Sequence, residues 1–220
     1  VGDLIALDEG VNTISVSVTA KDNSTTQTYT IEVARQSASE FSERAYLKAI
    51  NRDAEDWFGF SLSLSENADM LALGDGLESS SATGINGDET DTSAFNSGAA
   101  YVFERDGTGN WTQQAYFKAS NTDQSDGFGM AVAMSADGST LAAGAPFEAS
   151  AATGVNGDET DNSFWGAGAV YIFTRDDSGA WAQEAYIKAS NTDQYDRFGG
   201  SVSLSDDGST LAVGAYSEGS

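Results

Sequence analysis

A repeat with a period of 70 residues restricts the possible folds of this chain more than any other feature of its sequence. The stretch Ala45–Ala49 returns at Ala115–Ala119 and again at Ala185–Ala189, with only its third residue changed. Self-similarity at a fixed interval indicates a repeat architecture in which each copy forms one structural unit. We expect these units at residues 41–110, 111–180 and, in shortened form, 181–220.

Each unit contains a Phe-Gly pair followed by a stretch in which apolar and polar residues alternate. The pairs begin at Phe58, Phe128 and Phe198. Alternation with a period of two predicts a β-strand. In the second unit an Asp-Gly pair at Asp137 then supplies a tight turn into another apolar strand, and β-rich runs such as Ala99–Arg105 predict a further one. Together with the segment that opens each unit, we expect four strands per unit and no helix.

Short strands repeated in tandem predict an all-β fold. We interpret the units as an incomplete β-propeller built of four-stranded antiparallel blades. A β-sandwich is the alternative, but a sandwich does not need near-identical strands at constant spacing. Two and a half units are fewer than the roughly four to eight blades that close a ring. We therefore expect the remaining blades of the same chain to be partners of this segment.

The second unit contains a characteristic order of motifs. Phe128-Gly129 and its alternating strand are followed by Leu141–Pro146, with the sequence LAAGAP, and then by Gly168–Phe173. This order resembles the FG-GAP repeat of integrin-α-like β-propellers over about residues 41–220. Two copies, at Gly74–Gly76 and Gly214–Tyr216, depart from the third part of the motif. The resemblance implies a propeller of the kind found in surface adhesion proteins.

Residues 1–36 follow a different pattern. Apolar and polar residues alternate in Gly10–Val18 and in Thr28–Val33, on either side of turn residues Lys21–Ser24, which predicts a two-stranded hairpin. This hairpin resembles the last strands of a cadherin-like β-sandwich domain found in bacterial surface proteins. We expect residues 1–36 to be the C-terminal end of such a domain and residues 37–40 to be a linker.

The charge and composition exclude several classes of function. Ten Lys and Arg against 34 Asp and Glu give a net charge of −24, so nucleic acid and anionic membrane surfaces would be repelled. The chain has no Cys and no His, which removes thiol nucleophiles, the commonest general base and the preferred ligands of zinc and copper. No apolar run approaches the roughly 18 residues of a membrane span, so we expect no direct membrane insertion by this segment.

Two acidic loops recur in the complete units and are the candidate metal sites. Both read Asn-x-Asp-x-x-Asp; the first follows the opening strand of a unit and the second lies in the long connection after the third strand. Oxygen ligands at such short gaps suit Ca²⁺, which takes six to eight oxygens. The competing interpretation is that Asn, Asp and Gly simply form turns here. The candidate calcium ligands are Asn51, Asp53, Asp56, Asn86, Asp88, Asp91, Asn121, Asp123, Asp126, Asn156, Asp158 and Asp161.

The position of these loops differs from the calcium loop of the integrin family. That loop lies between the Phe-Gly strand and the Gly-Ala-Pro strand, where this chain has only Ser135–Ser139, so the family's ligands are not carried over. In an up-and-down meander, the two acidic connections of a unit emerge at the same end of the sheet. The connection Asp75–Ser97 is longer than the roughly 12 to 15 residues of an ordinary loop. We therefore expect any binding site at this end.

The repeats also decide how other candidate residues are interpreted. Paired acids such as Asp123 and Asp126 suit glycosidase chemistry, but a catalytic pair is needed once and these acids recur in each unit. No phosphate-binding lysine loop, serine elbow or dinucleotide glycine motif occurs. Recurrence at a fixed phase favours packing between blades over sugar stacking for the aromatic residues Trp111, Trp181, Tyr116, Tyr186, Tyr171 and Phe173.

The resemblance and the exclusions together predict a non-catalytic binding or adhesion module, extracellular or on the cell surface. It would present its acidic loops, with or without calcium, to a protein or glycan partner. The alternative is the propeller region of a secreted hydrolase or lyase whose catalytic residues lie elsewhere. A structural spacer is the third interpretation, because fold analogy alone is a weak guide to function.

Overall fold

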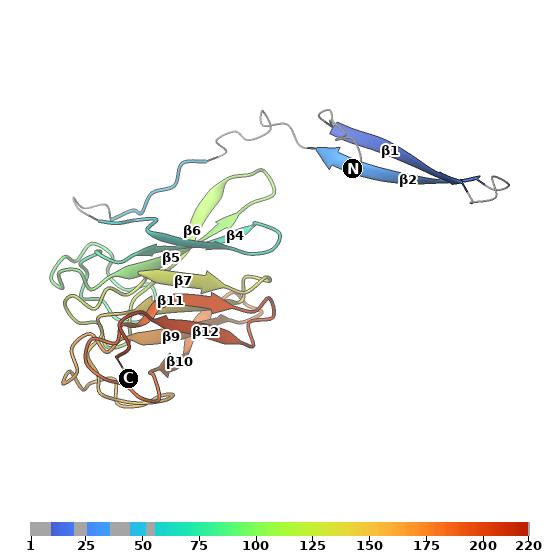
Figure 1. The fold of residues 1–220 in the computed structure, drawn as a ribbon. Helices are drawn as coiled ribbons and strands as arrows, with labels where there is room; N and C mark the ends of the chain where they lie inside the picture. Colours follow the sequence, from blue (N-terminus) through green and yellow to red (C-terminus); the bar gives the residue numbers. More distant parts are fainter. Residues whose placement is uncertain (1–9, 20–25, 36–44, 52–55, 220) are drawn as a thin grey trace. The chain divides into compact units, whose positions relative to one another are not determined.

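The structure, a computed structural model, describes residues 10–19, 26–35, 45–51 and 56–219. All regular elements within these residues are β-strands, as the sequence predicts (Figure 1). The chain divides into two units, Val1–Tyr46 and Leu47–Ser220, which are considered separately below.

The first unit contains the predicted hairpin. Strand β1 (Gly10–Thr19) pairs antiparallel with β2 (Thr26–Arg35) in an unbroken register from Gly10↔Arg35 to Thr19↔Thr26. The alternating sequence therefore forms the ladder that its pattern predicts. The predicted turn at Lys21–Ser24 lies outside the described residues.

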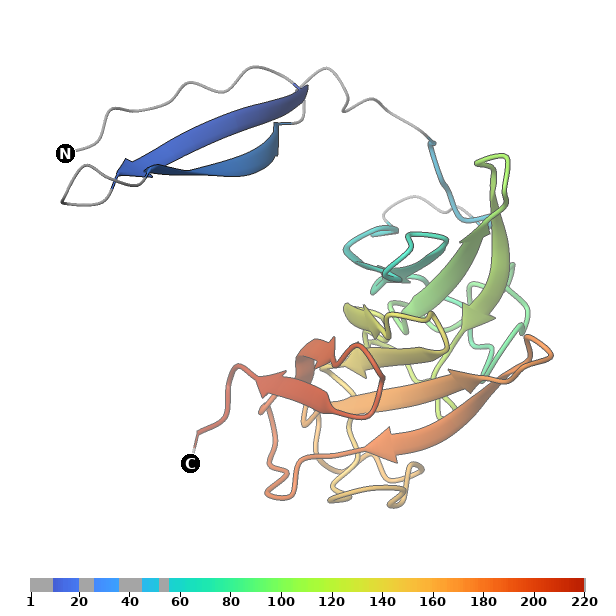
Figure 2. The same ribbon diagram turned by 90° about the vertical axis from the view of Figure 1, so that its right-hand side faces the viewer.

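The second unit consists of successive antiparallel sheets whose strands follow chain order. The first sheet contains β3 (Ser61–Leu64), β4 (Met70–Asp75), β5 (Ala99–Arg105) and β6 (Trp111–Phe117). The second contains β7 (Ala131–Met134), β8 (Thr140–Ala145), β9 (Ala169–Arg175) and β10 (Trp181–Ile187). The third contains β11 (Phe198–Leu204) and β12 (Leu211–Ala215). These tandem sheets confirm the interpretation as an incomplete propeller; Figure 2 shows them beside one another.

The sheets are offset by one strand from the predicted units 41–110 and 111–180. Strand β6 pairs with β5, with Arg105 opposite Trp111, so it completes the first sheet instead of opening the second. The corresponding stretch of the first unit, residues 45–49, is not a strand. The reason is that β6 and β10 each pair with the strand just before them in the same unit, and the described part of the second unit contains no strand before β3.

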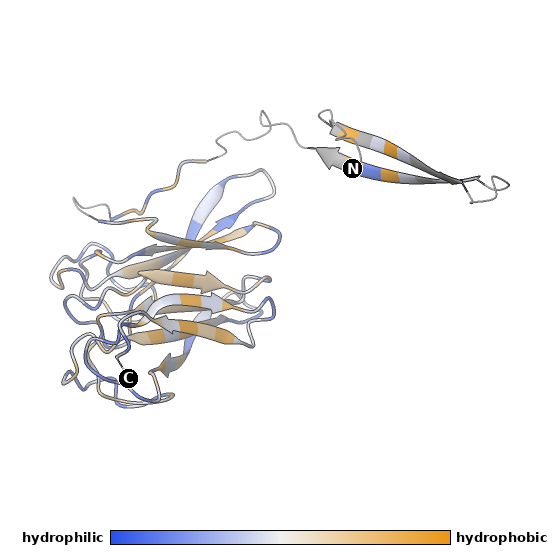
Figure 3. Cartoon of the chain, viewed as in Figure 1, coloured by the Kyte–Doolittle hydropathy of each residue, from blue (hydrophilic) through white to orange (hydrophobic). Residues whose placement is uncertain are grey.

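The core lies between neighbouring sheets. Val132 and Met134 of β7 are only 7% and 6% exposed and belong to the same core cluster as Met70 and Val102 of the first sheet. The recurrent aromatic residues Tyr116, Tyr171, Tyr186 and Phe173 are fully buried in these clusters, and Trp111 and Trp181 pack against them. They belong to the core, as their fixed phase predicts. Figure 3 shows the apolar residues concentrated on the strands and the polar ones on the connections.

The Phe-Gly pair joins one sheet to the next. The Phe128 N–H donates to the Ser97 carbonyl oxygen at 2.9 Å, and a parallel bridge links Phe128 to Gly98. Gly129 has φ +82°, and a Cβ on it would lie 2.0 Å from the Ala99 oxygen. The same contact recurs one repeat later, where a Cβ on Gly199 would lie 2.3 Å from the Ala169 oxygen. The motif thus keeps glycine where the backbones of two sheets touch.

Candidate functional site

The long connections gather at one end of the sheets, which we call the loop end. It consists of residues 76–98, 118–130, 146–168 and 188–197, which lie between the strands that end and begin there. Phe117 at the end of β6 lies opposite Ala100 at the start of β5, so the connections that leave and enter these strands are neighbours. The two acidic loops therefore share one end, as predicted (Figure 1).

Backbone hydrogen bonds fasten the long connection 76–98 to the end of β6. The Lys118 N–H donates to the Gly84 carbonyl oxygen at 2.8 Å, and the Gly84 N–H donates to Ala119 at 3.3 Å. Asn86, in the left-handed region with φ 55°, accepts the Tyr116 N–H on its Oδ1 at 3.0 Å. Asn156 accepts the Tyr186 N–H in the same way at 2.9 Å. In both repeats, the side chain of the first residue of this acidic loop thus holds the loop to the backbone of the neighbouring strand by a hydrogen bond.

The two aspartates of the same loop also accept hydrogen bonds from their own connection. Asp88 Oδ1 accepts the Thr90 N–H at 2.9 Å and the Thr90 hydroxyl at 2.7 Å, which forms an Asx turn. Asp91 Oδ2 accepts the Ser81 hydroxyl and the Ser81 N–H, each at 2.6 Å, and the Ser93 hydroxyl at 2.9 Å, and these bonds hold the pKa of Asp91 well below its usual value. Asp158 and Asp161 repeat both arrangements.

The other acidic loop connects one sheet to the next. Asn121 accepts the Tyr171 hydroxyl at 2.5 Å and donates to the Glu159 carbonyl oxygen at 2.8 Å. Asp126 is buried and accepts the Asp123 N–H at 3.0 Å. Asp123 accepts the Asn162 side-chain amide at 2.7 Å.

The first copy of this loop is only partly described. Asn51 accepts the Tyr101 hydroxyl at 3.0 Å, as Asn121 does with Tyr171. Asp56 lies close enough to Asp75 to raise its pKa. Asp53 lies outside the described residues.

The candidate ligands do not form a preformed metal centre. Among residues 10–19, 26–35, 45–51 and 56–219, no group of three or more acidic, His or Cys side chains is arranged to hold a metal ion. The carboxylate oxygens instead accept hydrogen bonds from nearby N–H and O–H groups. Calcium binding by these loops stays a prediction.

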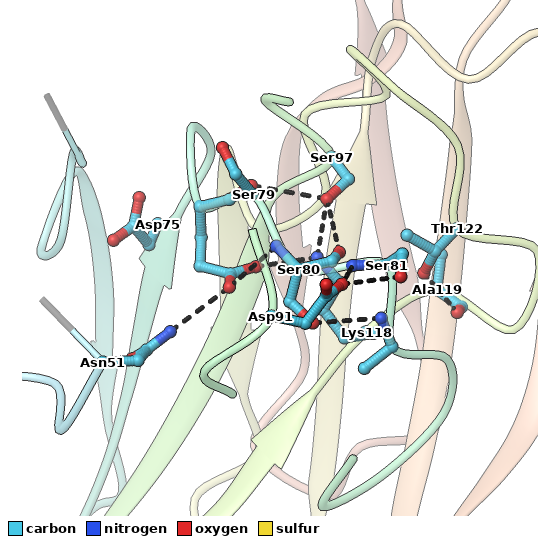
Figure 4. A network of polar contacts seen from close by, with 12 residues as sticks. Asn51, Asp75, Ser79, Ser80, Ser81, Asp91, Ser97, Lys118, Ala119 and Thr122 are labelled. Carbon is cyan, nitrogen blue, oxygen red and sulfur yellow. Dashed lines mark hydrogen bonds and ion pairs between the residues drawn. The ribbon is translucent and has the colours of Figure 1, made fainter. Parts of the chain in front are cut away.

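A buried ion pair lies beneath each long connection. Lys118 Nζ is 2.7 Å from Glu78 Oε2, with side chains 0% and 2% exposed, and it also donates to the Ser97 hydroxyl at 2.7 Å. Figure 4 shows Lys118, Ser97 and Ser80 joined in this network. Lys188 and Glu148 form the same pair at 2.6 Å in the next repeat. Burial lowers the pKa of both lysines, but the Glu partners favour the charged form.

The ion pairs were not predicted from the sequence, although a signal for them exists. Three of the four lysines, Lys48, Lys118 and Lys188, recur at intervals of 70 residues in a strongly acidic chain, and Glu78 and Glu148 share that interval. Charged residues that recur at a fixed phase next to apolar strands are buried only when paired.

Buried acids at the loop end have perturbed pKa values. Burial raises the pKa of Asp126 to about 8, and burial together with the nearby Asp56 raises that of Asp75 to about 6. Such shifts are common at catalytic sites. Asp126, however, has a counterpart in Asp196, which is equally buried and accepts the Asp193 N–H at 2.8 Å. A buried aspartate that recurs with the same hydrogen bond is part of the structure of each repeat.

The geometry defines a class of protein: four-stranded antiparallel sheets in tandem, joined through Phe-Gly pairs, are blades of a β-propeller. The family model of the FG-GAP repeat matches residues 111–173 and 181–220, and that of the cadherin-like beta sandwich domain matches residues 3–36. The chain therefore carries FG-GAP repeats preceded by a cadherin-like segment. Most of the first sheet lies outside the matched residues, yet it has the same strand order as the second.

The two families are typical of extracellular adhesion modules, and their members are typically non-catalytic. A search of curated proteins finds no match. The described part of the chain contains no helix long and apolar enough to cross a membrane.

Proposed function

We propose that this segment is a non-catalytic binding module, extracellular or on a cell surface, whose loop end contacts a protein or glycan partner. The observation that carries the proposal is the loop end itself, where both complete repeats turn exposed carboxylates such as Asp88 and Asp158 to solvent. Hydrogen bonds hold these loops in fixed conformations, so little order is lost on binding.

The opposite end of the sheets provides a built-in control. It carries short turns, in which exposed Asp106 and Asp176 accept the N–H groups of Thr108 and Ser178 at 2.8 Å. Asp88 and Asp158 accept the N–H groups of Thr90 and Thr160 in the same manner. Replacing either pair by Asn removes two charges and keeps an oxygen acceptor for the turn.

The test is a binding screen with these matched variants. Wild type, Asp88→Asn/Asp158→Asn and Asp106→Asn/Asp176→Asn are applied to immobilised panels of cell-surface proteins and glycans at physiological salt. We expect saturable binding that weakens in the first variant and persists in the second. Equal binding by all three proteins would contradict a loop-end site, and absence of saturable binding would favour a structural spacer. Hydrolase or lyase activity of the full-length protein, lost on replacing one non-repeated acid, would favour the enzyme alternative.

The outer face of β3 supports a second part of the proposal, that further sheets of the same kind pack on this segment. Leu62 and Leu64 are 63% and 49% exposed, whereas their counterparts Val132 and Met134 are buried against the preceding sheet. An apolar face repeated at the same phase fits one partner best, another blade of the chain. Extending the segment by the further repeats that would close the ring should raise its unfolding midpoint and reduce binding of a hydrophobic dye; unchanged values would contradict this contact.

A further inference from the structure

A pocket at the loop end lies where the first two sheets meet. Its volume is about 280 Å³, and apolar side chains form most of its walls: Leu77 from connection 76–98, Met130 from connection 118–130, and Phe147 and Trp165 from connection 146–168. The Phe147 and Trp165 rings are stacked, with centroids 6.3 Å apart. Trp165 is 48% exposed, so the aromatic wall is open to solvent.

The pocket exists because the second repeat lacks a side chain that the third repeat has. Gly127, which lines the pocket, has φ +66°, and its counterpart Arg197 has φ 63°. The Arg197 guanidinium lies 4.3 Å from the Phe147 ring centroid and extends over Gly166, where a Cβ would be 2.4 Å from Nη1. At the junction between the first and second sheets, the counterpart of Gly166 is Asn96, which lines the pocket. This first junction is therefore open, whereas the second junction, between the second and third sheets, is filled by Arg197.

The repeats make this difference informative. Features that recur, such as the ion pairs, the Asx turns and the Phe-Gly joint, hold each sheet in place. Of the two junctions between sheets that the structure describes, only the first has this open pocket, and the rings of its wall are braced by Arg197, which also lies 4.8 Å from the Trp165 ring. A feature built once, with a rigid aromatic wall, is suited to a ligand.

The lining and the surrounding charge indicate the occupant. A volume of about 280 Å³ is just below the roughly 300–1,000 Å³ of small-molecule sites and fits one side chain. Asn96 and Ser125 are the polar side chains of the lining, so a sugar would leave most of its hydroxyls unpaired. The four connections of the loop end together contain twelve acidic residues against three basic ones, Lys118 and Lys188, which are buried in ion pairs, and Arg197, which packs on the aromatic wall. A positively charged partner complements this surround.

We propose that this pocket receives one apolar side chain of a protein partner whose flanking residues are basic. The pocket supplies the anchor contact, and the acidic connections attract the charged residues on either side. The proposal rests on the proposed function, since it names the partner class of the same end of the sheets.

The experiment uses synthetic peptides with three lysines on each side of a central Leu, Phe or Gly, titrated calorimetrically into the protein at physiological salt. Burial of the central side chain should make the Leu and Phe peptides bind about 10- to 150-fold more tightly than the Gly peptide. The double variant Asn96→Gly/Gly127→Arg, which reproduces the second junction, should remove this preference. Thr112→Arg, which adds the same charge at an exposed position of β6, should keep it.

A second variant guards against misfolding of the first. Leu77→Ser, which introduces the residue found two repeats later at Ser217, makes one wall polar and should also abolish the preference. Thermal unfolding of each variant establishes that it is folded. Equal affinity of the Leu and Gly peptides for wild type would overturn the pocket while leaving loop-end binding intact. Binding of neutral oligosaccharides that is lost in Asn96→Gly/Gly127→Arg would overturn the choice of a protein partner.

Discussion

Replacing Gly129 by Ala tests whether the sheets touch through the Phe-Gly pair. Gly129 and Gly59 occupy the same motif position with φ +82° and +86°. An Ala at either site costs of order 1–3 kcal/mol for this backbone conformation. The surroundings differ, because a Cβ at Gly59 has no heavy atom within 4 Å, whereas one at Gly129 lies 2.0 Å from the Ala99 oxygen. Gly59→Ala is therefore a control that carries the backbone cost alone.

The additional cost at Gly129 follows from the distance. Ordinary van der Waals contact begins at 3.4 Å, so the second sheet must move away from the first by about 3.4 − 2.0 = 1.4 Å. Overpacking of this kind costs roughly 1–3 kcal/mol. Weakening the hydrogen bond from Phe128 N–H to Ser97, 2.9 Å long, adds about 1 kcal/mol. We expect Gly129→Ala to be destabilised by about 2–4 kcal/mol more than Gly59→Ala.

Urea unfolding followed by circular dichroism measures the difference. With a slope of about 2 kcal/mol per molar urea, the two midpoints should differ by about 1–2 M. Gly199→Ala, with its Cβ 2.3 Å from the Ala169 oxygen, should behave like Gly129→Ala. Midpoints for Gly59→Ala and Gly129→Ala that agree within about 0.2 M would refute this reasoning. They would show that glycine is needed at this position for its backbone conformation and not for the close approach of two sheets.

Three further predictions concern the loop end. Lys118→Met leaves Glu78 buried without its cation and should cost about 3–5 kcal/mol in urea unfolding, whereas adding Glu78→Leu should recover most of the loss; no recovery would refute the pairing. Because the pKa of Asp126 is raised from 3.8 to about 8, the folded state holds a proton that the unfolded chain releases, so stability should fall by up to about 1.4 kcal/mol per pH unit between these values. Asp126→Asn should flatten that pH profile, and a profile identical to wild type would refute the assignment. If the acidic loops bind Ca²⁺ with roughly 10⁻⁴–10⁻³ M affinity, 10 mM Ca²⁺ at matched ionic strength should stabilise the protein by about 1.4–2.7 kcal/mol. An unchanged unfolding midpoint would refute calcium binding by these loops.

The period of the sequence predicts the sheets but does not by itself fix where each sheet begins. A repeat of 70 residues can be divided at any point, and the division before Trp111 separated β6 from its partner. The signal that decides the matter is the length of the connections. Asp106–Asn110 is a short turn, which joins strands of one hairpin, whereas the connection 118–130 is long enough to pass from one sheet to the next.

The loop end was predictable in its position and its acidity, but not in its internal contacts. Alternating strand directions are sufficient to bring the two acidic loops together. Whether a carboxylate faces an ion or the N–H group two residues away depends on dihedral angles that composition does not specify, as the Asx turn at Asp88 shows. The pairing of Lys118 with Glu78, 40 residues apart, likewise depends on how the long connection folds back over β6.

In a chain of near-identical units, each copy serves as a control for the others. A side chain that recurs with the same partners, as Asn86 and Asn156 do, has a role that every sheet needs. A binding site for a single partner needs no such recurrence, because its contacts are made once. Gly127 and Arg197 donate the same backbone hydrogen bond, to Asn96 and to Gly166 respectively, yet the side chain at this position decides whether the junction is open or filled. Departures from the period are therefore the positions at which a propeller of this kind can acquire specificity while the joint between its sheets is kept.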